Sequence, residues 1–175
     1  RSVPEGARRL AAAFWPGPLT LILPRAPNVA DVVTGGQDSV GLRVPAHPVA
    51  RALLRAFGGG IAAPSANRFG RISPTTAQHV ADDLGDAVAQ ILDGGACAVG
   101  IESTIVAFVG DVPVLLRPGG IDARDLSRTL GHALRDTDAS APRTSGTLAS
   151  HYAPRTPAGL VAADALRAEI LQLCA

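Results

Sequence analysis

Lysine is absent from this 175-residue sequence, so each of its 16 basic residues is an arginine. A phosphate-binding P-loop and a lysine Schiff base both need a lysine side chain, so both are excluded within these residues. Methionine is absent as well, and the sequence starts inside an apparent helix. These two features predict that the sequence is a piece of a longer protein.

The net charge is also small, and the sequence has only two cysteines. A net charge of +1 is too small to attract a polyanion over long range, which disfavours non-specific RNA or DNA binding. Cys97 and Cys174 lie far apart and match no metal-ligand spacing, which favours a reducing cytoplasm over a secreted disulfide scaffold. The sequence shows no signal peptide, no membrane-length apolar run and no Gly-x-Ser-x-Gly motif. A membrane partner and covalent hydrolase chemistry therefore lack support.

Hydrophobic residues, 47% of the sequence, recur with helix-like and strand-like periods. Helices are predicted from a capping box at Ser2–Glu5 to residue 14 and at 48–57, 74–84, 122–130 and 164–173. Strands are predicted at 19–23, 40–44, 61–64, 89–92, 104–109, 113–116 and 159–161, with 104–116 forming a β-hairpin. This alternation predicts an α/β or mixed α+β fold, in which helices pack on a mixed sheet.

Composition divides the chain into three parts. Residues 1–134 carry the alternating pattern of a globular domain. Residues 135–157 are rich in Asp, Ser, Thr, Pro and Arg, which is typical of a linker. Residues 158–175 return to apolar periodicity, and we interpret them as the beginning of a second, small domain.

Two arginines stand out by their surroundings. Arg43 lies in the predicted strand 40–44 between apolar residues, where an unpaired buried charge would be very costly. A structural salt bridge and a carboxylate-binding arginine both satisfy that requirement. Arg117 ends a predicted strand just before Pro118-Gly119-Gly120, so its guanidinium should emerge at a tight turn. It is either a phosphate clamp or a solvated arginine at a strand end.

Small polar residues follow or precede the predicted strands. Ser65 and Asn67 come directly after strand 61–64, where open α/β sheets usually bind ligands, although both are also common turn formers. Glu102-Ser103-Thr104 enters the next strand, and from the tripeptide alone a preference for β structure is the favoured interpretation. His151-Tyr152 lies in the predicted linker, either as a lid over a groove or as an anchor to the core.

In order along the chain, seven motifs together resemble the threonylcarbamoyl-AMP synthase family. They are Phe14-Trp15-Pro16-Gly17-Pro18-Leu19-Thr20, Val40-Gly41-Leu42-Arg43-Val44-Pro45, Ala63-Pro64-Ser65-Ala66-Asn67, Ser73-Pro74-Thr75, Gly100-Ile101-Glu102-Ser103-Thr104-Ile105-Val106, Leu116-Arg117-Pro118-Gly119 and His151-Tyr152-Ala153-Pro154. Each motif alone is weak, whereas their shared order is specific. The last one resembles the linker of the two-domain form, in which a small domain follows the YrdC-like domain. The resemblance thus implies a twisted open mixed sheet with flanking helices.

The family resemblance implies a nucleotidyltransferase reaction between L-threonine, bicarbonate and ATP. Threonine becomes a carbamate, whose oxygen attacks the α-phosphorus to give threonylcarbamoyl-AMP and pyrophosphate. A separate transferase then uses this product to modify tRNA, so the implied partners include that transferase and a weak contact with tRNA. Mg²⁺ is expected on the ATP phosphates, with few protein ligands.

Site residues follow from the resemblance position by position. The threonine pocket would consist of Arg43, Ala63 and Ser103. The ATP side would consist of Ser39, Ser65, Asn67, Ser73, Arg117 and Tyr152, the last lying over the opening of the site. No protein nucleophile is implied, so positioning and charge neutralisation by Arg43 and Arg117 would drive the reaction.

The sequence departs from the family pattern in two ways. The family's Thr/Tyr threonine-binding motif and its Lys-x-Arg phosphate-binding pair do not occur here, so this chain alone is expected to bind ATP poorly and to have little synthase activity. The family usually places an acid after Ser-Thr-Ile-Val, where this sequence has Ala107.

Two other functions remain open at this point. One is that of relatives that make carbamoyl-adenylate, although the linker motif at 151–154 points away from them. The other is a non-catalytic module that binds double-stranded RNA or the ribosome, against which the near-neutral charge counts.

Overall fold

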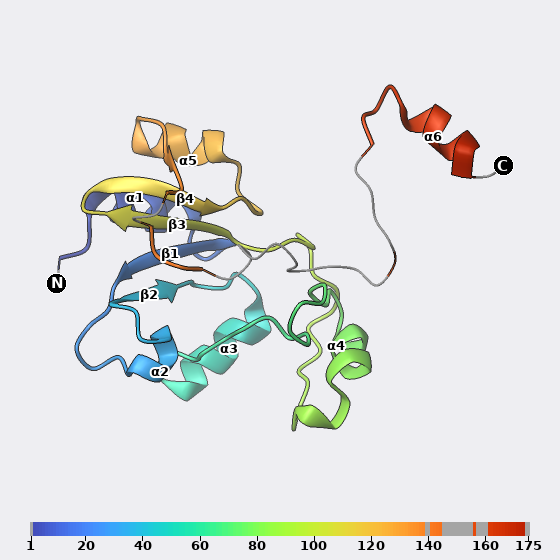
Figure 1. Cartoon of the computed structure of the whole chain (residues 1–175). Coiled ribbons are helices and arrows are strands. Elements are labelled where there is room, and N and C mark those ends of the chain that lie inside the picture. The colour runs from blue at the N-terminus through green and yellow to red at the C-terminus, as the bar shows by residue number, and fades with distance from the viewer. Residues whose placement is uncertain (1, 139–140, 145–155, 157–160, 174–175) are drawn as a thin grey trace.

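A computed structural model of the protein describes residues 2–138, 141–144, 156 and 161–173 (Figure 1). Its helices are α1 (Glu5–Phe14), α2 (Asp31–Thr34), α3 (Pro48–Phe57), α4 (Ala77–Leu84), the short η1 (Gly85–Ala87), α5 (Ala123–Leu130) and α6 (Leu166–Leu173). Its strands are β1 (Leu19–Pro24), β2 (Ser39–Leu42), β3 (Thr104–Val109), β4 (Val112–Arg117) and β5 (Arg135–Asp136). No helix in the described part of the chain has the length and apolar character needed to cross a membrane.

The five strands form one open mixed sheet in the order β2-β1-β3-β4-β5. β1 pairs antiparallel with β2 and parallel with β3, while β4 pairs antiparallel with β3 and parallel with β5. The predicted hairpin is confirmed, and its turn contains Gly110 with a positive φ of 61°. The predicted α/β class with a mixed sheet and flanking helices is therefore confirmed.

Apolar side chains on both faces of the sheet hold the strands in place. One face packs against α1 and α5, which lie together beside the sheet in Figure 1, and its buried core includes Leu10, Leu21 and Leu126. The opposite face carries a smaller cluster formed by Ile105, Ala107, Val114 and Leu116. Strand β3 is buried on both faces, as the apolar run in its sequence predicts for a central strand.

The residue at the position of the family's usual acid belongs to this second cluster. Ala107 is fully buried among apolar side chains. A carboxylate at this position would need an ion-pair or hydrogen-bond partner, because burial without one is strongly unfavourable. Alanine is therefore compatible with the neighbours that this chain provides.

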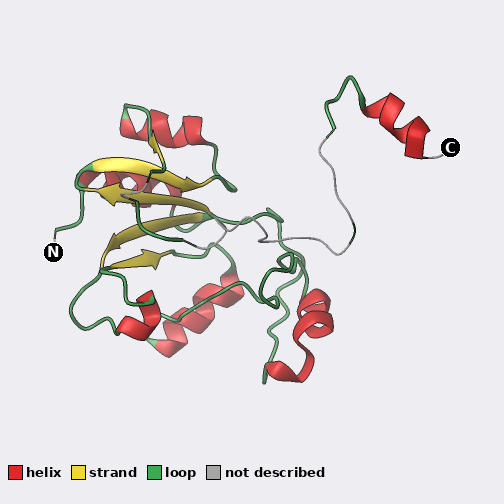
Figure 2. Ribbon diagram, viewed as in Figure 1, coloured by secondary structure: helices red, strands yellow, loops and turns green. Residues whose placement is uncertain are grey.

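Two predicted strands are wrong. Residues 61–64 and 89–92 are loop segments (Figure 2), and Ile61 and Leu92 are exposed. Their apolar runs resemble buried strands, but a strand needs a neighbour to which its backbone can pair. Within the described residues, neither segment takes part in strand pairing.

Helix α3 was predicted at its observed bounds, whereas α4 begins at Ala77 instead of the predicted residue 74; both helices bury no side chain completely. Leu53 and Phe57 on α3 are 45% and 64% exposed. Both helices lie on the side of β2 away from α5 (Figure 1). Their ends follow local rules, because Thr76 caps α4 and glycines follow the last turn of each helix.

The predicted capping box at the start of α1 is wrong. Pro4 occupies the N-cap position with extended dihedral angles, and no side chain caps the helix. The extended Pro4 separates Ser2 from the first turn, so its hydroxyl does not serve as the cap. Glu5 still places negative charge at the helix N-terminus, where the helix dipole favours it.

Part of the predicted linker belongs to the sheet. Arg135 and Asp136 form β5, and Arg143 exchanges two hydrogen bonds with the Gln37 side chain across the sheet. The predicted helix near the C-terminus is confirmed as α6. Most of the strand-like segment 159–161 and the whole His151-Tyr152 motif lie outside the described residues.

Candidate functional site

Four strand ends meet at one edge of the sheet. The register places the first residues of β1 beside those of β3, with the last residues of β2 and β4 next to them. Hydroxyl and guanidinium side chains therefore gather at this edge from sequence positions about a hundred residues apart. We refer to this group, consisting of Thr20, Glu102, Ser103 and Arg117, as the polar edge.

Arg117 is the centre of the polar edge. Its Nε and Nη2 atoms donate to the backbone oxygen of Ser103 at 3.2 and 2.9 Å, and Nη2 also donates to the Ser103 hydroxyl at 3.2 Å. The Ser103 hydroxyl shares a further hydrogen bond of 2.8 Å with the Thr20 hydroxyl on β1. These contacts fix the guanidinium across the ends of three neighbouring strands.

Glu102 extends the polar edge toward the loop that precedes α4. Its Oε2 atom lies 3.7 Å from Nη2 of Arg117, and its Oε1 atom accepts a hydrogen bond from the Ser73 hydroxyl. The Ser73 hydroxyl also lies 3.4 Å from Oδ1 of Asn67. Two sequence-predicted residues of the loop are thus linked to Arg117 through one carboxylate.

Asn67 and Asp83 shape this loop, which comprises residues 67–73. The Asn67 amide donates to the backbone oxygens of Arg68 and Arg71 at 2.9 and 3.1 Å. The Asp83 carboxylate on α4 accepts the Arg68 backbone N–H at 2.7 Å and forms an ion pair with Arg71. The Arg68 N–H, followed by the Arg71 and Arg68 guanidinium groups, lowers the pKa of Asp83 below its ordinary value of 3.8 despite opposing desolvation.

Asp83→Asn is expected to loosen the 67–73 loop at neutral pH but not in acid. A lowered pKa means that the folded loop favours the charged carboxylate. The stabilisation is therefore complete above the ordinary value of 3.8 and is lost as pH falls through the lower folded-state pKa. Hydrogen exchange at the Arg68 amide should be roughly tenfold faster in the variant at neutral pH. Asp86→Asn on η1 is the control, and an equal difference at all pH values would contradict the prediction.

Close backbone packing holds the Glu102–Thr104 segment in place. A Cβ atom on Gly119 would lie 2.4 Å from the Glu102 oxygen and the Thr104 nitrogen, so only glycine fits there. The Thr104 hydroxyl also exchanges two 2.9 Å hydrogen bonds with the backbone of Ile121. The turn after β4 therefore supports the residues that hold Arg117.

Arg43 differs from its predicted setting. It follows β2, is exposed, and its Nε donates to the Gly17 oxygen at 3.2 Å. Because Arg43 is exposed, the expected burial between apolar residues is wrong, and within the described part of the chain it forms no ion pair. β2 ends at Leu42, and beyond it the Val44 carbonyl accepts the Gly17 N–H outside the β1–β2 ladder. Arg43 still lies at the same end of the sheet as Thr20.

The other predicted site residues have no described contact with the polar edge. Ala63 and Ser65 are exposed in the loop after α3, and Ser65 makes no hydrogen bond to the described residues. Ser39 pairs with Pro24 at the far end of β1, about 13 Å along the strand from Arg43. Tyr152 lies outside the described residues. The structure thus brings together Ser103, Arg117, Ser73 and Asn67, with Arg43 nearby, and separates Ser39 from them.

Sequence reasoning missed Glu102, Thr20 and Asp83 as members of this arrangement. Glu102 was weighed only as part of a β-favouring tripeptide, although it is the sole acid between Asp93 and Asp111. Thr20 lies in an otherwise apolar strand, which was a usable signal. Asp83 gave no such signal, because its role depends on a loop ten or more residues away.

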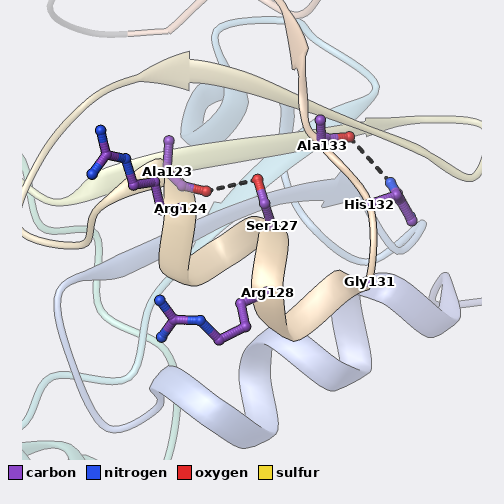
Figure 3. A pocket seen from close by; sticks show the side chains of 7 residues that line it. All are labelled: Ala123, Arg124, Ser127, Arg128, Gly131, His132 and Ala133. Carbon is purple, nitrogen blue, oxygen red and sulfur yellow. Dashed lines mark hydrogen bonds between the residues drawn. The ribbon is translucent and has the colours of Figure 1, made fainter.

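A shallow hollow on α5 lies apart from the polar edge (Figure 3). It is lined by Ala123, Arg124, Ser127, Arg128, Gly131, His132 and Ala133. Three of its polar side chains are engaged locally: Ser127 donates to the Ala123 oxygen, His132 bonds to Ala133, and Arg128 pairs with Asp125. No sequence-predicted site residue lines it.

The described residues form an open mixed sheet with flanking helices, and its polar edge carries two hydroxyl groups, a carboxylate and a guanidinium. The family model Sua5_yciO_yrdC, described as Telomere recombination, matches residues 1–119. The chain belongs to this family.

Two curated relatives share the same name. The threonylcarbamoyl-AMP synthase of Bacillus subtilis is 46% identical over 159 residues, covering 88% of this chain and 46% of that protein. The threonylcarbamoyl-AMP synthase of Pyrococcus abyssi is 40% identical over 182 aligned residues, covering 100% of this chain and 54% of that protein. The chain spans about half the length of these relatives.

A solved structure agrees with these sequence comparisons. The crystal structure of P. abyssi Sua5 complexed with L-threonine has a TM-score of 0.83 and 39% identity to this chain. The similarity covers 99% of this chain and 53% of the other. The described fold is thus that of the corresponding part of this relative.

Proposed function

We propose that the chain is part of an L-threonylcarbamoyladenylate synthase, which makes threonylcarbamoyl-AMP and pyrophosphate from L-threonine, bicarbonate and ATP. The observation that carries the proposal is the polar edge, where Arg117 and Ser103 are locked together and linked to Ser73 and Asn67. The names of the relatives, and the threonine complex of one of them, support the same function.

On this proposal, Arg43 and Ser103 bind threonine. The Arg43 guanidinium is exposed at the sheet edge, where it can pair with the substrate carboxylate. The Ser103 hydroxyl, oriented by Thr20 and Arg117, can contact the polar part of the amino acid. Ala63 would supply an apolar wall from the loop after α3.

The ATP side would consist of Arg117, Ser73 and Asn67, with Ser65, Ser39 and Tyr152 as further candidates. The threonine amine combines with bicarbonate to give a carbamate and water. A carbamate oxygen then attacks the α-phosphorus, and the bond to pyrophosphate breaks. This step needs the reactants held in line and their negative charge balanced, which guanidinium and hydroxyl groups can do without a protein nucleophile.

Mg²⁺ fits this site as an ion carried by the nucleotide. The described residues contain no cluster of three or more His, Cys, Asp and Glu side chains suited to a metal ion. Magnesium commonly takes most of its ligands from phosphate oxygens and water. Bound in that way, it would neutralise phosphate charge, while Arg117 and Ser73 orient the phosphates.

The proposed reaction has two further consequences. Its product is an unstable mixed anhydride, so a cytoplasmic tRNA threonylcarbamoyl transferase should consume it close to where it forms. Any contact of this chain with tRNA should be weak, because the net charge is only +1.

The function is tested with the protein in its natural full-length form. Purified protein is incubated with L-threonine, bicarbonate and ATP, and both pyrophosphate and threonylcarbamoyl-AMP are measured. Each substrate is omitted in turn. Formation of both products only with the complete mixture supports the proposal, whereas pyrophosphate release without L-threonine would contradict it.

Arg43→Ala is expected to weaken L-threonine binding by about a hundredfold, because an arginine–carboxylate pair with good geometry contributes about 3 kcal/mol. Isothermal titration with L-threonine measures the change. Arg51→Ala on the neighbouring helix α3 removes the same charge elsewhere. Equal weakening in both variants would point to general electrostatics rather than to a carboxylate contact.

A further inference from the structure

Glu102 brings negative charge to the part of the site proposed to hold phosphate. Its two carboxylate oxygens face different donors, because Ser73 donates to Oε1 and the Arg117 guanidinium lies 3.7 Å from Oε2. The proposed function assigns both of these donors to ATP. One internal carboxylate therefore interacts with two residues needed by the incoming anion.

Carboxylate and phosphate oxygens compete for the same partners. Both accept hydrogen bonds from guanidinium and hydroxyl groups, and both are favoured by positive charge. A phosphate that approaches Ser73 and Arg117 also meets the Glu102 charge within a few ångströms. Two anions at that separation repel, most strongly where water is partly excluded.

The surroundings allow the Glu102 side chain to move while its backbone stays fixed. The Glu102 backbone oxygen accepts the Gly120 N–H at 3.0 Å, and Gly119 packs directly against the same peptide. The Glu102 side chain is 30% exposed, whereas that of Arg117 is only 12% exposed. The carboxylate can therefore turn toward solvent without disturbing the hydrogen bonds between Arg117 and Ser103.

We propose that Glu102 is an internal competitor of the nucleotide phosphates: its carboxylate holds Ser73 and Arg117, and a phosphate binds by displacing it. This inference rests on the proposed function and adds a residue that sets the affinity for ATP and eases release of pyrophosphate. Before ATP binds, the contacts of the Glu102 carboxylate also keep Ser73 and the 67–73 loop close to Arg117.

The test compares Glu102→Gln with the unaltered protein in the full-length chain. Glutamine keeps the side-chain shape and an oxygen that can accept from Ser73, but it removes the charge. Binding of ATP, inorganic pyrophosphate and L-threonine is measured separately by isothermal titration. Glu5→Gln is the matched control, because Glu5 is exposed in the first turn of α1. Thermal unfolding checks that each variant is folded.

Glu102→Gln should bind ATP and pyrophosphate about tenfold more tightly, as expected when one repulsive charge near a partly exposed site is removed. L-Threonine binding should stay unchanged, and Glu5→Gln should behave like the unaltered protein. If Glu102→Gln does not fold, Glu102→Asp withdraws the carboxylate by one methylene and should give a smaller gain.

Equal or weaker binding of ATP and pyrophosphate by the Glu102 variants, with normal binding by the unaltered protein, would overturn the competition while leaving the proposed function intact. That result would make Glu102 a residue that supports the nucleotide. If no version of the protein binds ATP, the proposed function fails, and the competition fails with it.

Discussion

Arg117→Ala is expected to reduce ATP binding by at least about a hundredfold, the largest effect on ligand binding among the substitutions considered. Arg117 holds the Ser103 oxygen through two nitrogens and faces the Glu102 carboxylate. On the proposed function, its loss also removes charge-assisted hydrogen bonds to the ATP phosphates, which contribute about 1.5–3 kcal/mol each. It also leaves the negative charge of Glu102 without its guanidinium neighbour. Isothermal titration of the full-length protein with ATP measures the change.

Two further variants make the result specific. Arg124→Ala removes an equally charged, exposed residue from α5 and should leave ATP binding unaltered. Arg117→Lys keeps the charge but lacks the planar fork that reaches the Ser103 oxygen with two nitrogens, so it should restore only a small part of the affinity. Full affinity in the lysine variant would show that charge alone matters.

Gly119→Ala is expected to destabilise the fold by about 3 kcal/mol or more, because the new methyl group would overlap fixed backbone atoms. The Glu102 oxygen and the Thr104 nitrogen would both lie 2.4 Å from it. Neither atom can move easily, since Gly120 binds the first and the Pro18 oxygen binds the second. The midpoint of urea unfolding should fall accordingly.

Gly60→Ala is the matched control for this substitution. Nothing lies within 4 Å of a Cβ atom at Gly60, and its φ is not in the left-handed region. Its unfolding midpoint should stay close to that of the unaltered protein. A similar loss in both variants would mean that glycine flexibility, rather than the close approach at Gly119, explains the result.

Apart from the capping box of α1, elements that depend on local sequence were predicted well. Asp122 caps α5 through the Arg124 N–H, and Gly131 follows its last turn in the left-handed conformation. The hairpin from β3 to β4 needs only two neighbouring apolar strands and a turn containing Gly110. These signals lie within a few residues of the structure that they determine.

Elements that depend on distant partners were predicted poorly. The segments 61–64 and 89–92 have strand-like composition, but composition does not specify whether a pairing neighbour exists. The burial expected for Arg43 failed for a related reason, since β2 ends before it and leaves it at an exposed edge. β-Propensity indicates which residues fit a half-buried sheet surface, but it does not show whether such a surface is available.

The same difference between local signals and distant partners applies to the candidate site. Arg117 was a candidate because a strand end and a tight turn are visible in the sequence, with a solvated arginine as the alternative, and the family resemblance pointed to Ser73 and Asn67. Their connection through Glu102 was not predicted, because it joins residues 29 positions apart through side chains alone. Contacts of that kind depend on how the loop before α4 lies against the sheet, which a single sequence does not reveal.

The 67–73 loop is held to the rest of the domain by a different kind of interaction from the one that holds the sheet. Apolar packing holds the sheet to α1 and α5, whereas Glu102, Ser73, Asp83 and Arg71 fasten the loop through charge and hydrogen bonds. Dissolved ions weaken the second kind of attachment much more than the first. Ionic strength should therefore govern how firmly the 67–73 loop is held, while the packing of the sheet on α1 and α5 changes little.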